Sequence, residues 1–251
     1  MQDSDTTRFV IVALVVLAVV AGGGIGLWLN ERRRRREIQR LAETLAVHAK
    51  WWRERRKAKG ELTYVAMGDS AAQGIGASKP HRSYVGLIAR QLRLTSGQSV
   101  RVINLSQSGA RLREVLAKQL PELAKLEPDI LTVSAGANDI ADFDAARFAR
   151  EVTELCSALP PGTLIADLPC FFVGRQEKDV RIANVILRRV AAEHLLTVVP
   201  LYATTRRKGF WLTALRNVAG DYFHPNDRGY RVWASAFLPL LPAVVSDIAE
   251  T

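Results

Sequence analysis

The hydrophobic residues of this chain follow two patterns that alternate from residue 60 onward. Short apolar runs, each typical of a buried strand, occupy 63–67, 100–105, 130–134, 164–168 and 197–199. Longer segments with the spacing of amphipathic helices follow them at 83–94, 111–126, 144–158, 176–195 and 227–248. Strands of about five residues separated by helices of ten or more indicate parallel βαβ units. The pattern predicts a three-layer α/β/α sandwich around a parallel sheet of five strands. Pro121 lies inside the second helical segment and is expected to kink or split it.

An uncharged apolar run covers residues 9–29, ahead of the alternating region. As a helix it would be about 31 Å long, which matches the hydrocarbon core of a bilayer. A cleaved signal peptide is the alternative. It is disfavoured because the preceding residues, 1–8, carry one Arg against two Asp, and because the run continues past the small residues of a cleavage site. The sequence therefore predicts a retained transmembrane helix at 9–29 after a short tail at 1–8.

The positive charge of the chain is concentrated after this run. The net charge is +10, and residues 31–59 supply twelve Lys/Arg against four Glu, including five consecutive arginines from Arg32 to Arg36. By the positive-inside rule, this bias predicts a single-pass membrane protein whose main domain faces the cytosol, with the arginines among anionic lipid headgroups. Residues 60–251 are almost balanced in charge, so no nucleic-acid partner is expected.

Residues 30–60 have a helical pattern and carry Trp51 and Trp52 among their charges. Two interpretations stay open at this point. One is an amphipathic helix that lies on the membrane with the Trp pair at headgroup level, and the other is a solvated linker helix. In both, Gly60 marks the boundary to a domain at 61–251.

Four short polar segments lie at or near the ends of predicted strands or just before the last helix. They are GDS at 68–70, NLSQSGA at 104–110, GANDI at 136–140 and DYFHPNDRGY at 221–230. In parallel sheets the ligand crevice lies beyond the carboxyl ends of the strands, so these segments are expected to meet there.

The residue types in these segments suit acyl transfer through a serine. A hydroxyl needs a base to take its proton, and a carboxylate fixes the tautomer of that base, so Ser70, His224 and Asp221 suit these three roles. Donors must also face the oxygen that becomes negative. The N–H groups of Ser70 and Gly109 and the side-chain amide of Asn138 are the candidates. The four histidines of the chain share no ligand spacing, so no metal or other cofactor is implied.

The same four segments, in the same order, resemble the conserved blocks of the SGNH hydrolases, also called the GDSL esterase/lipase family. The resemblance spans about residues 62–247. It implies a flavodoxin-like fold, a nucleophilic serine, an oxyanion hole that includes Gly and Asn, and a His oriented by the Asp three residues before it. In this sequence these residues are Ser70, Gly109, Asn138, His224 and Asp221. The leucine of the GDSL motif is Ala71 here, a change that bears on packing more than on chemistry.

Together, these features predict a membrane-anchored serine ester hydrolase that works through an acyl-enzyme. The anchor favours a lipid-derived ester such as a lysophospholipid, or another small acyl ester. An acyltransferase, a carbohydrate deacetylase on an outward-facing domain and a non-catalytic membrane-tethered binding protein on the same fold remain as alternatives. The apolar segments at 170–174 and 208–215 are expected either to line an acyl pocket or to serve in packing.

Overall fold

The central element of the protein is a five-stranded parallel sheet with the strand order β2-β1-β3-β4-β5. The computed structural model describes the backbone of residues 2–250 and the side chains of residues 23–246. The strands are β1 (Leu62–Gly68), β2 (Val100–Asn104), β3 (Ile130–Ser134), β4 (Leu164–Ala166) and β5 (Thr197–Val199). All five predicted strands are confirmed, although β4 ends two residues early. The order is that of flavodoxin-like sheets, in which a crevice opens where the chain reverses between β1 and β3.

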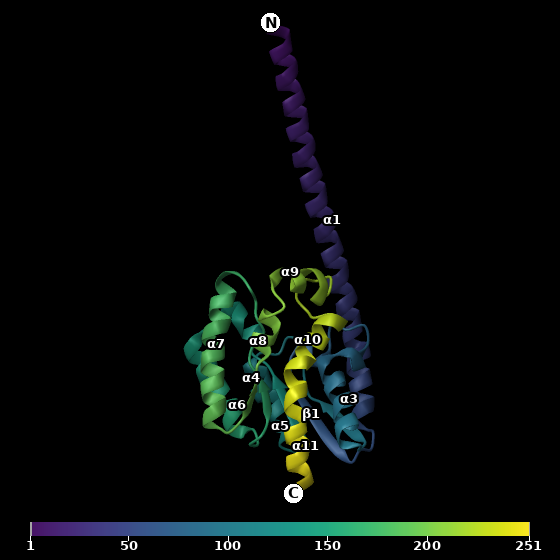
Figure 1. Ribbon diagram of the computed structural model, residues 1–251, viewed down its shortest axis with the longest axis vertical. Coiled ribbons are helices and arrows are strands. Elements are labelled where there is room, and N and C mark those ends of the chain that lie inside the picture. The colour runs from purple at the N-terminus through teal and green to yellow at the C-terminus, as the bar shows by residue number, and fades with distance from the viewer. Residues whose placement is uncertain (1, 251) are drawn as a thin grey trace.

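Helices cover both faces of this sheet (Figure 1). Along β1, Tyr64 and Ala66 pack into the core on one face, and Val65 and Met67 pack into the core on the other. This alternation is the two-residue period of a strand. The first face is covered by α3 (Tyr84–Ser96), α8 (Leu201–Arg206), α10 (Asp227–Phe237) and α11 (Leu241–Glu250). The second is covered by α4 (Leu112–Glu114), α5 (Leu120–Leu123), α6 (Ala145–Ala158) and α7 (Gly174–Glu193). The predicted three-layer sandwich is thus confirmed.

Prolines divide two of the predicted helices. The segment predicted at 111–126 forms α4, a π-helical turn η2 (Val115–Gln119) and α5, with Pro121 in the first turn of α5. A proline there lacks the N–H that a helix interior needs, so the split is the expected one. Likewise the last helix is interrupted by η5 (Leu238–Leu240). The remaining short elements are α2 (Ser70–Gln73), η1 (Pro80–Arg82), η3 (Ala137–Asp142), α9 (Phe210–Leu212) and η4 (Thr213–Asn217).

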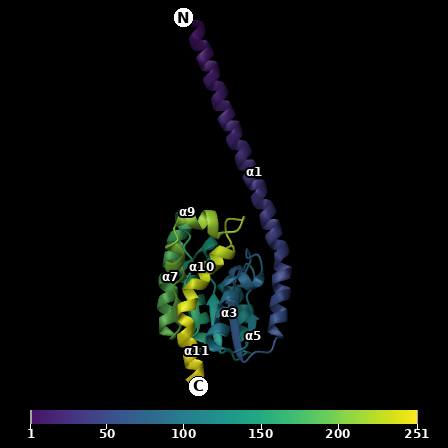
Figure 2. The ribbon, with the colours of Figure 1, turned by 45° about the vertical axis from the view of Figure 1, so that its right-hand side comes forward.

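Helix α1 (Gln2–Arg56) precedes the sheet and extends well beyond it (Figures 1 and 2). Within the described part of the chain, no helix combines the length and the apolar character needed to cross a bilayer. This finding contradicts the predicted transmembrane helix at 9–29, the single-pass membrane location and the cytosolic placement derived from it. Of that span, residues 9–22 lie outside the described side chains.

The C-terminal part of α1 packs against the domain beside the edge strand β2. The side chain of Trp52 is buried in the core, and Trp51 is half-buried. The guanidinium of Arg101 on β2 donates to the main-chain carbonyl of Arg56 at 3.0 Å. The predicted position of the Trp pair at lipid headgroups is therefore wrong, and this part of α1 is not a solvated linker either. The proposed binding of anionic lipid by Arg32 to Arg36 depended on the anchor and loses its basis.

Candidate active site

Three of the predicted side chains form one chain of hydrogen bonds. The Oγ of Ser70 lies 2.9 Å from Nε2 of His224, and Nδ1 of His224 lies 2.5 Å from Oδ2 of Asp221. The carboxylate can only accept a hydrogen bond, so Nδ1 carries the proton and Nε2 is left to accept the proton of the hydroxyl. The fold brings together a serine after the first strand and a histidine 154 residues later. This geometry suits general-base activation of a hydroxyl.

Ser70 lies at the start of the one-turn helix α2, where the chain leaves β1 abruptly. Gly68 has φ +147°, and a Cβ at this position would lie 2.2 Å from the carbonyl oxygen of Ser134 on the neighbouring strand. Only glycine permits this close approach. Asp69 then caps α2 by accepting the N–H of Ala71 at 2.9 Å. The GDS segment therefore turns the strand into a helix and presents Ser70 at the carboxyl end of the sheet.

The buried side chain of Gln119 makes two hydrogen bonds to the main chain of Gly68 in this turn. Its Oε1 accepts the N–H of Gly68 at 2.9 Å, and its Nε2 donates to the carbonyl of Gly68 at 2.8 Å. Gln119 is the last residue of the π-helical turn η2. It is 2% exposed. No sequence motif at this position points to Gln119, so its role beside Ser70 could not be predicted. The π-helical turn is a local irregularity of a kind that is often found at functional sites.

Asp221 and His224 are held in a tight loop before α10. Asp221 Oδ1 accepts the N–H groups of Phe223 and His224, at 3.0 and 3.1 Å, and Tyr222, which follows Asp221, adopts φ +60°. The N–H of Ala219 donates to the carbonyl of His224 at 2.7 Å and closes the loop. Burial raises the pKa of Asp221, but the hydrogen bonds from His224 and from these N–H groups outweigh it. The net pKa lies below the usual value, so the carboxylate stays charged.

Two contacts fix this loop against the nucleophile turn. Gly76 follows α2, and a Cβ there would lie 2.3 Å from the carbonyl oxygen of Pro225 and 3.1 Å from Cβ of His224. The buried hydroxyl of Tyr230 on α10 donates to the carbonyl of Ile75 at 2.6 Å. The close approach at Gly76 lets the imidazole reach Ser70, and α10 anchors both sides of the contact.

The predicted oxyanion donors lie around the same serine. Asn138 belongs to η3, and its Nδ2 donates to the carbonyl of Ala110 at 3.0 Å, with a long contact of 3.5 Å to Oδ2 of Asp69. This amide thus bridges the nucleophile turn and the loop of Gly109, which adopts φ +76°. Among the hydrogen bonds of residues 23–246, none occupies the main-chain N–H of Ser70 or of Gly109. Both N–H groups are available to a negatively charged oxygen.

Asp69 is a buried carboxyl beside the nucleophile. Burial raises its pKa to about 6, although the hydrogen bond from the N–H of Ala71 and the charge of His224 act in the opposite direction. The residue is only 5% exposed, so water does not stabilise the charged form of its carboxyl. Near neutral pH this carboxyl is therefore close to its titration range, right next to the reacting hydroxyl.

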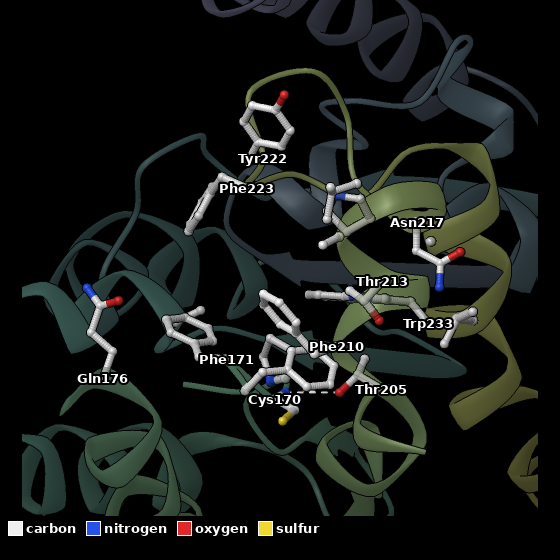
Figure 3. Close-up of a pocket in the computed structure, with 18 of the residues that line it drawn as sticks. Cys170, Phe171, Gln176, Thr205, Phe210, Thr213, Asn217, Tyr222, Phe223 and Trp233 are labelled. Carbon is white, nitrogen blue, oxygen red and sulfur yellow. Dashed lines mark hydrogen bonds between the residues drawn. The ribbon is translucent and has the colours of Figure 1, made fainter. Parts of the chain in front are cut away.

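An apolar cavity of about 610 Å³ opens beside these residues (Figure 3). Asn138 and Phe223 line it, so the cavity adjoins the site through the amide on one side and through the neighbour of His224 on the other. In Figure 3, Phe210 projects into the middle of the lining residues, with Phe171 on one side and Trp233 on the other. The volume is within the range of small-molecule sites. Both apolar segments considered in the sequence, 170–174 and 208–215, contribute to its wall.

Glu177 on α7 fixes one wall of this cavity. Its Oε2 accepts the N–H groups of Phe171 and Phe172, at 2.9 and 3.0 Å, and its Oε1 accepts the hydroxyl of Tyr202 at 2.5 Å. Phe172 adopts φ +67°, a conformation that is costly for a bulky residue. The buried carboxylate thus holds a strained loop in place. Sequence reasoning missed Glu177, because an acidic residue in the first turn of a helix is usually a solvated one.

The described residues gather no group of three or more His, Cys, Asp or Glu side chains that would hold a metal ion. Cys156 and Cys170 are both buried free thiols, and Cys170 contributes to the cavity wall.

Comparison with known proteins identifies the class to which this site belongs. The GDSL-like lipase/acylhydrolase family model matches residues 66–232, a stretch that contains all five predicted site residues. The chain belongs to this family, as the resemblance of its motifs implied, and is a serine hydrolase acting on carboxylic esters. No protein with a curated function matches the chain significantly.

Three solved structures illustrate the fold that this chain shares. LAE5, an α/β hydrolase enzyme from the metagenome of Lake Arreo, is 22% identical; the match covers 75% of this chain and 99% of LAE5, with a TM-score of 0.60. TesA is also 22% identical, over 72% of this chain and 99% of TesA, with a TM-score of 0.60. Axe2, an acetylxylan esterase from Geobacillus stearothermophilus, is 20% identical over 74% of this chain and 96% of Axe2, again with a TM-score of 0.60. At these identities the similarity establishes the fold.

Proposed function

We propose that this protein hydrolyses carboxylic esters through an acyl-enzyme formed on Ser70. His224 takes the proton of the hydroxyl as the oxygen attacks the acyl carbonyl, and then gives it to the leaving alcohol. Asp221 holds the imidazole and stabilises its protonated form. A water molecule, activated by the same imidazole, then releases the acid. The chain of hydrogen bonds at 2.9 and 2.5 Å through Ser70, His224 and Asp221 is the observation that carries this proposal.

The oxyanion of each tetrahedral intermediate is bound by the N–H groups of Ser70 and Gly109 and by the amide of Asn138. The two N–H groups have no acceptor among the described residues, and one amide proton of Asn138 is committed to Ala110. The second contact of the same nitrogen is the long one of 3.5 Å to Oδ2 of Asp69, which leaves its other proton for the oxyanion. Donors fixed in advance in this way stabilise charge that appears only in the transition state.

The substrate we propose is an ester with an apolar acyl group longer than acetyl. Eleven of the 21 residues that line the cavity beside Asn138 are Phe, Trp, Val or Ala, and most of the lining surface is apolar. An acetyl group, as removed by the acetylxylan esterase Axe2, would leave most of this volume unfilled. Burial of each CH₂ of a longer chain is worth about 0.8 kcal/mol, so the cavity favours a chain of several carbons.

The experiment is hydrolysis of a series of p-nitrophenyl esters from acetate to laurate by the full chain, beside Ser70→Ala. We expect kcat/KM to rise with chain length beyond acetate, and the serine variant to be inactive. Ala214→Phe, inside the cavity, should shift the optimum to shorter chains. Leu215→Phe is the matched control, because this next side chain is 78% exposed and does not line the cavity. Activity that survives Ser70→Ala would refute the mechanism, and a preference for acetate that Ala214→Phe leaves unchanged would refute the acyl cavity.

A further inference from the structure

The helix that carries Ser70 is a single turn, and its stability depends on what binds its carbonyl groups. A four-residue helix has no internal cooperativity and leaves its carbonyls without partners within the helix. The carbonyl of Ser70 accepts the N–H groups of Gly74 and Ile75, at 3.1 and 3.0 Å. The carbonyl of Ala72 accepts the side-chain amide of Asn104 at 2.8 Å. The last carbonyl, that of Gln73, needs a donor from elsewhere in the fold.

Helix α1 supplies two donors to that carbonyl. The indole N–H of Trp52 donates to the carbonyl of Gln73 at 2.9 Å, and Nδ1 of His48 lies 3.1 Å from the same oxygen. A carbonyl only accepts, so Nδ1 of His48 carries the proton. Both side chains are buried, at 2% and 4% exposed, one turn apart on the same face of α1. The C-terminal end of the nucleophile helix is therefore held by two buried donors of α1.

The same helix also contacts the loop that carries Asp221 and His224. The hydroxyl of Tyr222 donates to Oδ1 of Asn30 at 2.9 Å. A Cβ on Gly220 would lie 2.5 Å from Cγ of Glu37, so the backbone of this loop lies directly against α1. Figure 2 shows α1 running along one side of the domain and past the end at which α9 lies. Helix α1 thus contacts both segments whose alignment sets the distance between Ser70 and His224.

Helix α1 lies outside the part of the chain that is common to the family. The family match begins at residue 66, after the end of α1. The matches to LAE5 and TesA include 99% of each of those proteins but only 75% and 72% of this chain. From these observations we propose that His48 and Trp52 of α1 are positioning residues, which align the nucleophile helix with the base. This inference rests on the proposed function, because the alignment matters only for an attack by Ser70.

The test replaces the two donors in the full chain while the volume of each side chain is kept close to the original. Trp52→Phe removes the N–H, and His48→Leu removes the imidazole donor. We expect the double variant to lose about ten- to a hundredfold in kcat, because small misplacements of reacting groups cost that much. KM should stay within about twofold, because neither residue lines the cavity. Inactivation of Ser70 by an organophosphonate, which needs only the serine and its base, should slow by the same factor.

Two further variants separate positioning from general loss of structure. His48→Asn places an amide donor near the position of Nδ1, so the pair His48→Asn with Trp52→Phe should recover most of the lost kcat. Trp51→Phe is the matched control: it is the same substitution one residue away, on a half-buried ring packed 4.5 Å from Trp52, and should keep the wild-type rate.

If the wild type is active, three outcomes would overturn the proposed role of α1. One is a double variant with wild-type kcat, and another is a loss of kcat that Trp51→Phe reproduces. The third is a failure of the asparagine to restore the rate. A wild type that hydrolyses no ester and does not react with the organophosphonate would instead overturn the proposed function, and this inference with it.

Discussion

The contact of Gln119 with Gly68 predicts how strongly the nucleophile turn depends on one buried amide. In Gln119→Met the side-chain volume is nearly kept and both hydrogen bonds are lost. The carbonyl of Gly68 retains a partner, because it also accepts the N–H of Gln107 at 3.2 Å. The N–H of Gly68 donates to Oε1 of Gln119, and in the variant it is left buried without an acceptor.

The loss of stability follows from this difference between the carbonyl and the N–H of Gly68. Loss of the bond to a carbonyl that keeps another partner is worth about 0.5–1.5 kcal/mol, and an unsatisfied buried N–H costs about 1–3 kcal/mol. We therefore expect the free energy of unfolding to fall by roughly 2–4 kcal/mol. For a domain of this size the midpoint of thermal unfolding should fall by about 4–16 °C. Denaturant and thermal unfolding, followed by circular dichroism, measure this loss directly.

Gln119→Glu distinguishes the hydrogen bonds from simple packing. A carboxyl buried at this position is expected to have a raised pKa, and its protonated form can donate to Gly68 as the amide does. A raised pKa in the folded state gives stability that is complete below the unfolded pKa of about 4.3 and is lost as the pH rises through the folded pKa. The variant should therefore match the wild type near pH 4 and fall behind it near pH 8. A Gln119→Met protein within about 0.5 kcal/mol of the wild type would refute the reasoning.

Three further predictions concern the groups around the reacting serine. Asp221→Asn should lower kcat on the order of a thousandfold or more, because an amide can force His224 into the wrong tautomer; steady-state kinetics with near wild-type kcat would contradict this role. Asn138→Ala should lower kcat on the order of a hundredfold with little change in KM, since an oxyanion donor acts in the transition state; a change confined to KM would count against it. Asp69 has a pKa of about 6, above its usual value, so its own contribution to stability is greatest below about pH 4 and is lost as the pH rises through about 6. Asp69→Asn keeps an acceptor for the N–H of Ala71. The free energy of unfolding of this variant, measured with urea, should exceed that of the wild type by about 2–3 kcal/mol at pH 8 and equal it at pH 4. Equal stability of the two proteins at both pH values would contradict the raised pKa.

The sequence predicted the sheet because its signals are local. A strand such as 130–134 is short, mostly apolar and bounded by turn residues, so its length and composition identify it without knowledge of its neighbours. The candidate serine, the Asp–His pair and the candidate oxyanion donors were likewise predicted from residue types and their order along the chain. Parallel strands place their carboxyl ends at one edge, and this rule brings the segments together.

The N-terminal helix shows where the same local reasoning failed. Hydropathy along residues 9–29 led to a transmembrane helix, and the arginines after it led to a membrane-surface role for the segment around Trp52. The structure instead buries Trp52 and His48 against the nucleophile helix. A tryptophan among charges has the same pattern whether it meets a lipid or a groove of its own domain, so periodicity cannot tell the two apart.

The sequence by itself determined the layers of the fold and the chemical groups of the site. Only the tertiary structure decided what holds those groups in place: the clamp of Gln119 on Gly68, the donors of α1 on Gln73, the carboxylate of Glu177 behind the cavity wall and the cavity itself. Each joins segments far apart in the chain through one or two hydrogen bonds or through shape. Such contacts leave no periodic trace in a single sequence, because they depend on how finished elements pack and not on how each element forms.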